Sequence, residues 1–112
     1  MSLYCLALDL KNDPQLIAEY EAHHQKVWPE IIEGIKAVGL ANMQIFRVEN
    51  RLFMMIEADE NIDFDKQMKT LATLPRQQEW EALMWKYQQA LPGAKEGEKW
   101  ILMKKIFNLA EY

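Results

Sequence analysis

The order in which two apolar periodicities follow one another most constrains the fold of this chain. Residues Leu3–Leu10 alternate between leucines and other side chains, with the two-residue period of a β-strand. Between residues 14 and 39, apolar side chains instead recur every three or four positions, as in an amphipathic helix. Two β-rich runs, Met43–Val48 and Leu52–Ala58, then flank a short polar turn and predict a hairpin.

Prolines and capping residues divide the first helical stretch. Asp13 is a good N-cap and Pro14 suits the first helical position, so a helix is expected to begin there. Pro29 disfavours the α conformation at Trp28, which predicts a break at Trp28 and a second helix beginning at Pro29. Gly39 is a natural residue for ending that second helix.

The second helical stretch follows the same plan. Asp63 can cap a helix that Pro75 should interrupt. A further helix is expected to run to a stop at Leu91-Pro92-Gly93 and to carry an apolar stripe made of Trp80, Leu83, Met84, Tyr87 and Leu91. Residues Trp100–Leu109 are the last strand candidate.

The resulting order of strands and helices predicts an α+β protein with the ferredoxin-like split βαβ fold, in which helices cover one face of an antiparallel four-stranded sheet. The 112 residues suffice for one hydrophobic core, so residues 1–112 are expected to form a single domain. The other face of the sheet would carry Cys5, Ala7 and alternate hairpin residues. An open face this apolar predicts a homodimer, as in the dimeric α+β barrels.

Composition argues against several classes of protein. The net charge is −4 and the longest basic run is Lys104–Lys105, so a nucleic-acid partner is not expected. No apolar run approaches the ~20 residues of a membrane span. The lone Cys5 cannot build a disulfide framework, and the cytoplasm is the expected location. No phosphate-binding loop is present and His23-His24 would not converge on one ion, so neither cofactor nor metal is expected.

A polar aromatic stripe is predicted from the spacing of Tyr20, His24 and Trp28. At ~100° per residue, each four-residue step turns the helix face by only about 40°. His24 is the strong acid/base candidate because an imidazole titrates near pH ~6.5. His23 points about 100° away and is expected to be solvated. Spacing alone leaves open that Tyr20 and His24 are ordinary core residues with satisfied hydrogen bonds.

A second aromatic group lies in the later helical stretch and contains Trp80, Trp85 and Tyr87. Aromatic faces from two helical layers above one sheet would suit a sugar, whose C–H faces stack on indole rings. Trp85 lies off the stripe shared by Trp80 and Tyr87, so a surface or interface position is expected for it.

Residues 20–30 read Tyr-Glu-Ala-His-His-Gln-Lys-Val-Trp-Pro-Glu, and this segment resembles the Y-x-x-x-H-x-x-x-W-P-E signature of the L-rhamnose mutarotase family. The resemblance continues through the Asn42 region, Leu52-Phe53, Gln78–Trp80 and Lys105–Leu109. It implies a dimeric α+β barrel isomerase that interconverts the α and β anomers of a 6-deoxy sugar by cofactor-free acid/base ring opening. L-rhamnose is the implied default substrate and L-fucose the alternative.

The resemblance also implies roles for individual residues. His24 corresponds to the family's proton donor, and Tyr20 and Trp80 correspond to its sugar-binding residues. We expect Tyr20 to orient His24 or to complete a proton relay. Trp28 is a further residue that could stack on the sugar.

Two positions depart from the family pattern. Met43 stands where the family often has a second substrate tyrosine, and Glu81 follows Trp80 where the family often has a tryptophan doublet. Both are counted among the substrate-binding residues, and they leave the identity of the sugar open. Two rival functions also stay open, namely a cofactor-independent or haem-degrading monooxygenase on the same fold and a non-catalytic sugar-binding module.

Overall fold

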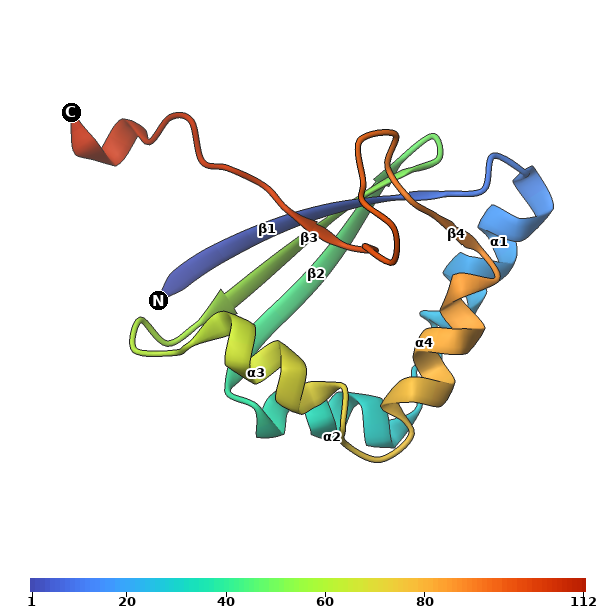
Figure 1. The fold of residues 1–112 in the computed structure, drawn as a ribbon, viewed down its shortest axis with the longest axis horizontal. Coiled ribbons are helices and arrows are strands. Elements are labelled where there is room, and N and C mark those ends of the chain that lie inside the picture. Colours follow the sequence, from blue (N-terminus) through green and yellow to red (C-terminus); the bar gives the residue numbers. More distant parts are fainter.

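The computed structural model describes all 112 residues and follows the predicted order of elements, with every helix on the same side of the sheet (Figure 1). The elements in chain order are β1 (Ser2–Leu10), α1 (Pro14–His23), α2 (Pro29–Ala37), β2 (Leu40–Val48), β3 (Arg51–Ala58), α3 (Phe64–Leu71), α4 (Gln77–Trp85), β4 (Gln88–Gln89), β5 (Ile101–Leu102) and the 3₁₀ turn η1 (Leu109–Glu111). No helix is long and apolar enough to cross a membrane.

The sheet has the order β2-β3-β1-β4, and β5 also pairs with β1. All the strand pairs are antiparallel. This order confirms the predicted ferredoxin-like topology, except that the fourth strand is divided. β4 pairs with Asp9 and Leu10 at one end of β1, whereas β5 pairs with Leu6 and Ala7 further back.

Local signals account for most helix ends. The Asp13 carboxylate accepts hydrogen bonds from the backbone N–H groups of Gln15 and Leu16, as expected of an N-cap. Trp28 takes the extended conformation that Pro29 requires, with φ −58° and ψ 137°. Gly39 follows α2 in the left-handed conformation, with φ 87°.

The first helix nevertheless ends earlier than predicted. α1 stops at His23, and the next residues form a tight turn in which the N–H of Gln25 bonds the Ala22 carbonyl and that of Lys26 bonds the His23 carbonyl. These i→i−3 bonds tighten the chain into a turn and end the regular helix before Trp28. Trp28 therefore does not continue the α1 stripe.

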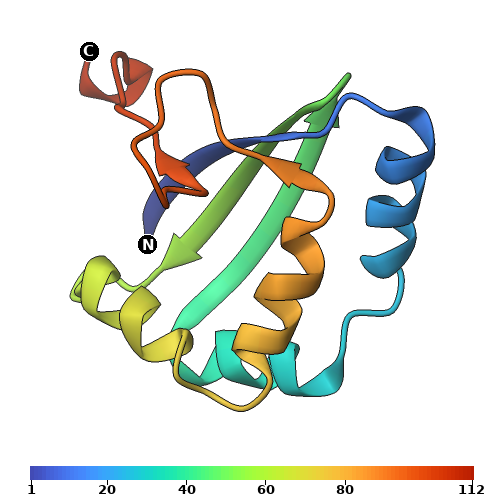
Figure 2. The ribbon, with the colours of Figure 1, turned by 45° about the vertical axis from the view of Figure 1, so that its right-hand side comes forward.

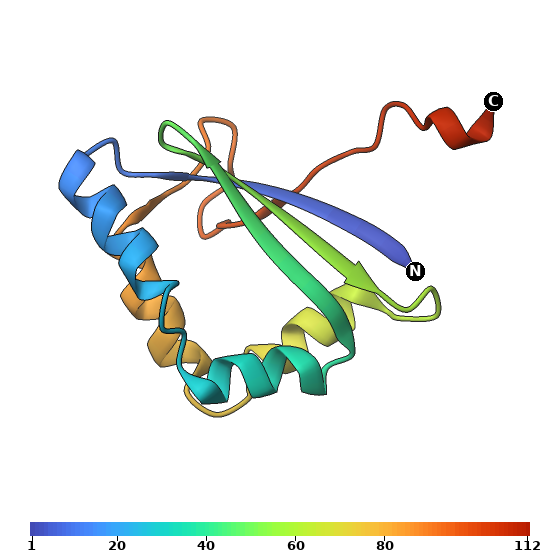
Figure 3. The same ribbon diagram turned by 180° about the vertical axis from the view of Figure 1, so that it is seen from behind.

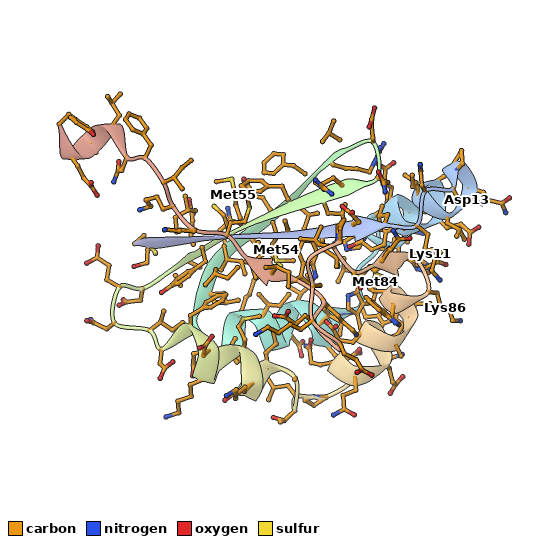
Figure 4. All side chains as sticks on the ribbon, turned by 45° about the horizontal axis from the view of Figure 1, so that its top comes forward. Lys11, Asp13, Met54, Met55, Met84 and Lys86 are labelled. Atoms are coloured by element: carbon orange, nitrogen blue, oxygen red, sulfur yellow. The ribbon has the colours of Figure 1, made fainter.

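The C-terminal third departs most from the prediction. α4 ends at Trp85, so the expected helix up to Leu91 is wrong, and the Tyr87 carbonyl instead accepts from the N–H of Lys11 at 2.8 Å. Figure 4 shows Lys11 and Lys86 at this shared end of the molecule. The predicted strand Trp100–Leu109 is also wrong beyond its start, because only Ile101–Leu102 forms β5 and the rest leads away from the body (Figure 3).

The core consists of two clusters beneath the sheet. One is aliphatic and contains Leu6, Val38, Leu40, Met54, Ile56, Ala58 and Leu71. The other is rich in aromatic residues and contains Leu10, Tyr20, Ile31, Leu52, Trp80, Met84 and Tyr87. The second cluster lies where α1 and α4 descend side by side from one end of the sheet (Figure 2).

The opposite face of the sheet is open. The register places Cys5, Phe46, Phe53 and Met55 there, whereas Met54 faces the core. Phe46 is 50% exposed and Val48 is 69% exposed on this face. The chain therefore presents apolar surface on the side away from its helices.

Candidate functional site

A cavity of about 870 Å³ lies between the helices and the inner face of the sheet. Its volume is within the ~300–1,000 Å³ typical of small-molecule sites. Most of its lining is hydrophobic. Side chains of the aliphatic cluster line one end, and Tyr20, His24, Trp80 and Gln88 line the other.

His24 lies at the C-terminal cap of α1, where its ring is held by its own helix. Its Nδ1 is 2.9 Å from the backbone carbonyl oxygen of Tyr20. Because a carbonyl oxygen can only accept, Nδ1 carries the proton in this bond. The other ring nitrogen, Nε2, has no hydrogen-bond partner in the chain. His24 lines the cavity, and Nε2 is its unpaired ring nitrogen.

The protonation state of His24 follows from its burial. Desolvation lowers the pKa of His24 below its usual value and outweighs the hydrogen bond to the Tyr20 carbonyl, which raises it. The imidazole is therefore neutral at pH 7, and Nε2 offers a lone pair. In this state His24 accepts a proton before it can donate one.

Tyr20 is only 3% exposed and packs its ring against that of His24, with 4.5 Å between ring centroids. Burial raises the pKa of Tyr20 to about 12, so the phenol keeps its proton throughout the physiological range. Its oxygen accepts a hydrogen bond from Nε2 of Gln88 at 3.4 Å. The hydroxyl proton of Tyr20 is left without an acceptor in the chain and is available as a donor.

Trp80 completes the aromatic wall and Trp28 stands behind it. The Trp80 ring meets the edge of His24 at 5.7 Å and that of Trp28 at 5.1 Å. Trp28 does not line the cavity, and its outer side is covered by the guanidinium group of Arg76 at 4.0 Å. The structure thus brings Trp80 beside His24 but keeps Trp28 out of the cavity.

Met43 and Glu81 both line the cavity, at different places. Met43 is half-buried on β2 and packs against the aliphatic cluster. Glu81 is exposed on α4 and forms an ion pair with Lys99 at 3.3 Å. An ion pair between two lining residues joins Arg47 to Glu21 at 2.7 Å, and no sequence motif singles these two residues out.

The prediction that His23 is solvated is wrong. His23 is half-buried, and its Nε2 lies 3.2 Å from the hydroxyl of Tyr87. Tyr87 in turn donates to a carboxylate oxygen of Glu19 at 3.2 Å. Since the Tyr87 proton is used in that bond, the hydroxyl accepts from Nε2–H of His23. His23 therefore belongs to a closed network that does not line the cavity.

Gln88 is another cavity residue that sequence reasoning missed. It is 4% exposed on β4, and its amide faces Tyr20. The apolar stripe of the expected helix did not include Gln88. The pairing of β4 with β1 is what turns its side chain toward Tyr20. Trp85 was expected at the surface or in an interface. Its side chain is 39% exposed, and the Lys99 ammonium group lies over its ring at 5.1 Å.

The split βαβ sheet defines a small α+β protein of the ferredoxin-like class, with a histidine-lined cavity between the helices and the sheet. The family model described as L-rhamnose mutarotase matches residues 3–109. An L-fucose mutarotase from Xanthomonas campestris pv. campestris is 43% identical across 99% of this chain and 90% of its own length. The chain belongs to the L-rhamnose mutarotase family.

Solved structures agree with the fold. A crystal structure of an L-rhamnose mutarotase from Formosa agariphila superposes with a TM-score of 0.71 at 19% identity, covering 97% of this chain and 99% of the other. A dimeric ferredoxin-like protein from an uncultured marine organism gives 0.56 at 15% identity, covering 83% and 95%. These likenesses confirm the predicted α+β fold.

Proposed function

We propose that this protein is a mutarotase that interconverts the α and β anomers of a 6-deoxy-L-hexose. The observation that carries the proposal is the free Nε2 of a neutral His24 in an aromatic cavity, within a member of the L-rhamnose mutarotase family. L-rhamnose and L-fucose are the two substrates to test, since the family is named for the first and the 43% identical relative for the second.

The chemistry needs one proton to move between two oxygens that share a carbon. Nε2 of His24 takes the proton from the C1 hydroxyl, the C1–O5 bond breaks, and C1=O1 forms. The imidazolium then delivers the same proton to O5, so atoms and charges balance. His24 is thus the donor that the family resemblance implies, but it donates a proton that it has just accepted.

Reclosure reverses these steps on the other face of the aldehyde. Rotation about the C1–C2 bond presents that face to O5, whose proton returns through Nε2 to O1. Tyr20 stays protonated and donates a hydrogen bond to whichever oxygen carries negative charge. We assign sugar stacking to Trp80, and we assign to Trp28 the support of Trp80 from behind.

The assembly is part of the proposal. Apolar side chains on the open face of the sheet, among them Leu3 (47% exposed), Phe46 (50%) and Val48 (69%), would be covered in a homodimer. Size-exclusion chromatography with light scattering checks this, and a monomer at micromolar concentration would contradict it. The single free Cys5 is compatible with the cytoplasmic location that we also propose.

Saturation-transfer NMR between the two anomeric protons tests the reaction. The wild-type protein should accelerate exchange of L-rhamnose or L-fucose, and neither sugar being accelerated would overturn the proposal. Tight, saturable sugar binding without exchange would identify a binding module instead. Haem binding, or oxygen consumption with an aromatic substrate, would identify a monooxygenase.

A further inference from the structure

One buried polar atom in this protein has no partner. Gln88 is 4% exposed and lines the cavity, and its Oε1 is the single buried side-chain nitrogen or oxygen without a hydrogen bond. Buried acceptors are nearly always satisfied, because an unpaired one destabilises the folded state. A buried acceptor in a cavity wall therefore points to a ligand that donates to it.

The other buried glutamine of the cavity shows the contrast. Gln77 is 5% exposed, and its Nε2 lies 3.4 Å and 3.5 Å from the backbone carbonyls of Glu30 and Ile31. It joins α4 to α2, and a Cβ placed on Gly34 would clash with its amide. Gln77 thus has a structural role, whereas the Gln88 side chain bonds the protein through its Nε2 alone.

The partner of that Nε2 is the hydroxyl of Tyr20. Because the hydroxyl oxygen accepts from Gln88, its own proton must point elsewhere, and no acceptor in the chain receives it. Gln88 and Tyr20 together therefore present an unpaired acceptor next to an unpaired donor. Both stand beside His24, whose ring is 4.5 Å from that of Tyr20.

We propose that Gln88 Oε1 accepts a hydrogen bond from a non-anomeric hydroxyl of the substrate, while Gln88 Nε2 fixes the Tyr20 hydroxyl as a donor to the same substrate. The proposal rests on the proposed function, because the occupant is taken to be a sugar. A polyol has what this pair requires, since each hydroxyl both donates and accepts. Gln88 thereby becomes a substrate-binding residue and a positioning residue for Tyr20.

The strand itself supplies a matched control. Gln89 neighbours Gln88 on β4 but points away from the cavity and is exposed. Changing either glutamine to methionine keeps the side-chain length and removes the amide. We expect Gln88→Met to raise the KM for the sugar and to lower kcat, together about tenfold in kcat/KM, while Gln89→Met changes neither.

Sugar analogues separate recognition from mere structural support. A series of L-fucose or L-rhamnose derivatives is measured in which the hydroxyl at C2, C3 or C4 is replaced by hydrogen or by fluorine. At the position that meets Gln88, the analogues should lose about tenfold with the wild-type chain and nothing further with the Gln88→Met chain. If Gln88→Met lowered kcat/KM by the same factor for the parent sugar and for every analogue, the proposal would be overturned.

Fluorine tests the direction of the hydrogen bond, since it cannot donate. If Oε1 is the acceptor, the fluoro and the deoxy analogue at that position lose equally in the wild-type chain. Retention of the full rate by the fluoro analogues at C2, C3 and C4 alike would overturn the assignment. This arm compares all three positions in the wild-type chain alone, so it stands even if Gln88→Met does not fold.

The two proposals fail in different ways. Absence of anomer exchange in the wild-type chain contradicts the proposed function. If the wild-type chain does accelerate exchange, but the loss caused by each analogue is the same in the wild-type and Gln88→Met chains, only the role of Gln88 is contradicted.

Discussion

Two hydrogen-bonded groups lie on opposite sides of the junction between α1, α4 and β4, and each residue of one group is the sequence neighbour of a residue of the other. Tyr20, His24 and Gln88 form the cavity side. Glu19, His23 and Tyr87 form what we call the outer network. Each group takes two residues four apart from α1 and its C-terminal cap, and one residue from the chain that follows α4.

The two groups differ in what they leave unpaired. In the outer network, the hydrogen bonds run from His23 through Tyr87 to Glu19 and end within the protein. On the cavity side each member keeps one free group, namely Nε2 of His24, the hydroxyl proton of Tyr20 and Oε1 of Gln88. Each side has a histidine and a tyrosine, so residue type does not distinguish the outer network from the cavity side. The unpaired hydrogen-bonding groups distinguish them, because the three residues that carry these groups line the cavity.

The largest effect should come from His24→Gln, and His23→Gln is its matched control. His24→Gln removes the proton-carrying Nε2, so the accelerated anomer exchange should fall by about 10²–10⁴-fold. His23→Gln should leave the rate within about twofold of wild type. Saturation-transfer NMR measures both, and similar losses in the two variants would break the comparison.

Acid should affect the rate through the cavity side. Because burial lowers the pKa of His24 below its usual value, most of the imidazole is still neutral at pH 6.5, and protonation takes place mainly below that pH. The enzymatic rate should be flat above pH 7 and should drop by about tenfold per pH unit once the lowered pKa is passed. The unfolded chain takes up this proton first, so stability also declines as pH falls below 6.5.

A pH–rate profile with the uncatalysed rate subtracted makes the measurement, and a denaturation series over the same range supplies the stability. A rate that rises as the pH falls from 7 to 5 would mean that the protonated form of His24 begins the reaction.

Removing one hydroxyl on the cavity side should have a smaller effect. Tyr20→Phe keeps the ring against His24 and loses only the hydrogen bond to the reacting oxygens, so kcat should fall by about tenfold. Steady-state exchange rates across sugar concentrations would show the change in kcat. An unchanged kcat would exclude Tyr20 as a donor in the transition state.

The same hydroxyl removed from the outer network should change stability instead. Tyr87→Phe breaks the bonds to Glu19 and His23, and the free energy of unfolding should fall by about 1 kcal/mol. Urea denaturation measures this loss, while the exchange rate should stay within about twofold of wild type. A tenfold loss of rate at unchanged stability would place Tyr87 in the reaction.

Much of this junction was predictable from the sequence, because its signals are local. The cap at Asp13 and the break at Pro29 set the first helices, and four-residue spacing places His24 over Tyr20. The same spacing failed for Trp28, since it assumed that the helix continued through the turn after His23.

The remaining features depend on contacts distant in sequence. Residues 80–91 have a helical period, yet Gln88 and Gln89 pair with β1 because β1 offers them an open edge. The partner of His23 lies 64 residues away, so its burial has no local signal. A free oxygen such as Oε1 of Gln88 is a property of the packed fold and of no sequence motif.

The aliphatic end of the cavity has a consequence for which sugars can be accepted. If His24 binds the sugar as proposed, part of the pyranose would face Leu6, Met43 and Met54, whose side chains have no hydrogen-bond donor and no strong acceptor. The methyl carbon of a 6-deoxy sugar suits that wall, whereas a hexose with an oxygen at C6 would bury it there without a partner. We therefore expect the protein to prefer the deoxygenated sugar, because the far wall of the cavity has no partner for an oxygen at C6.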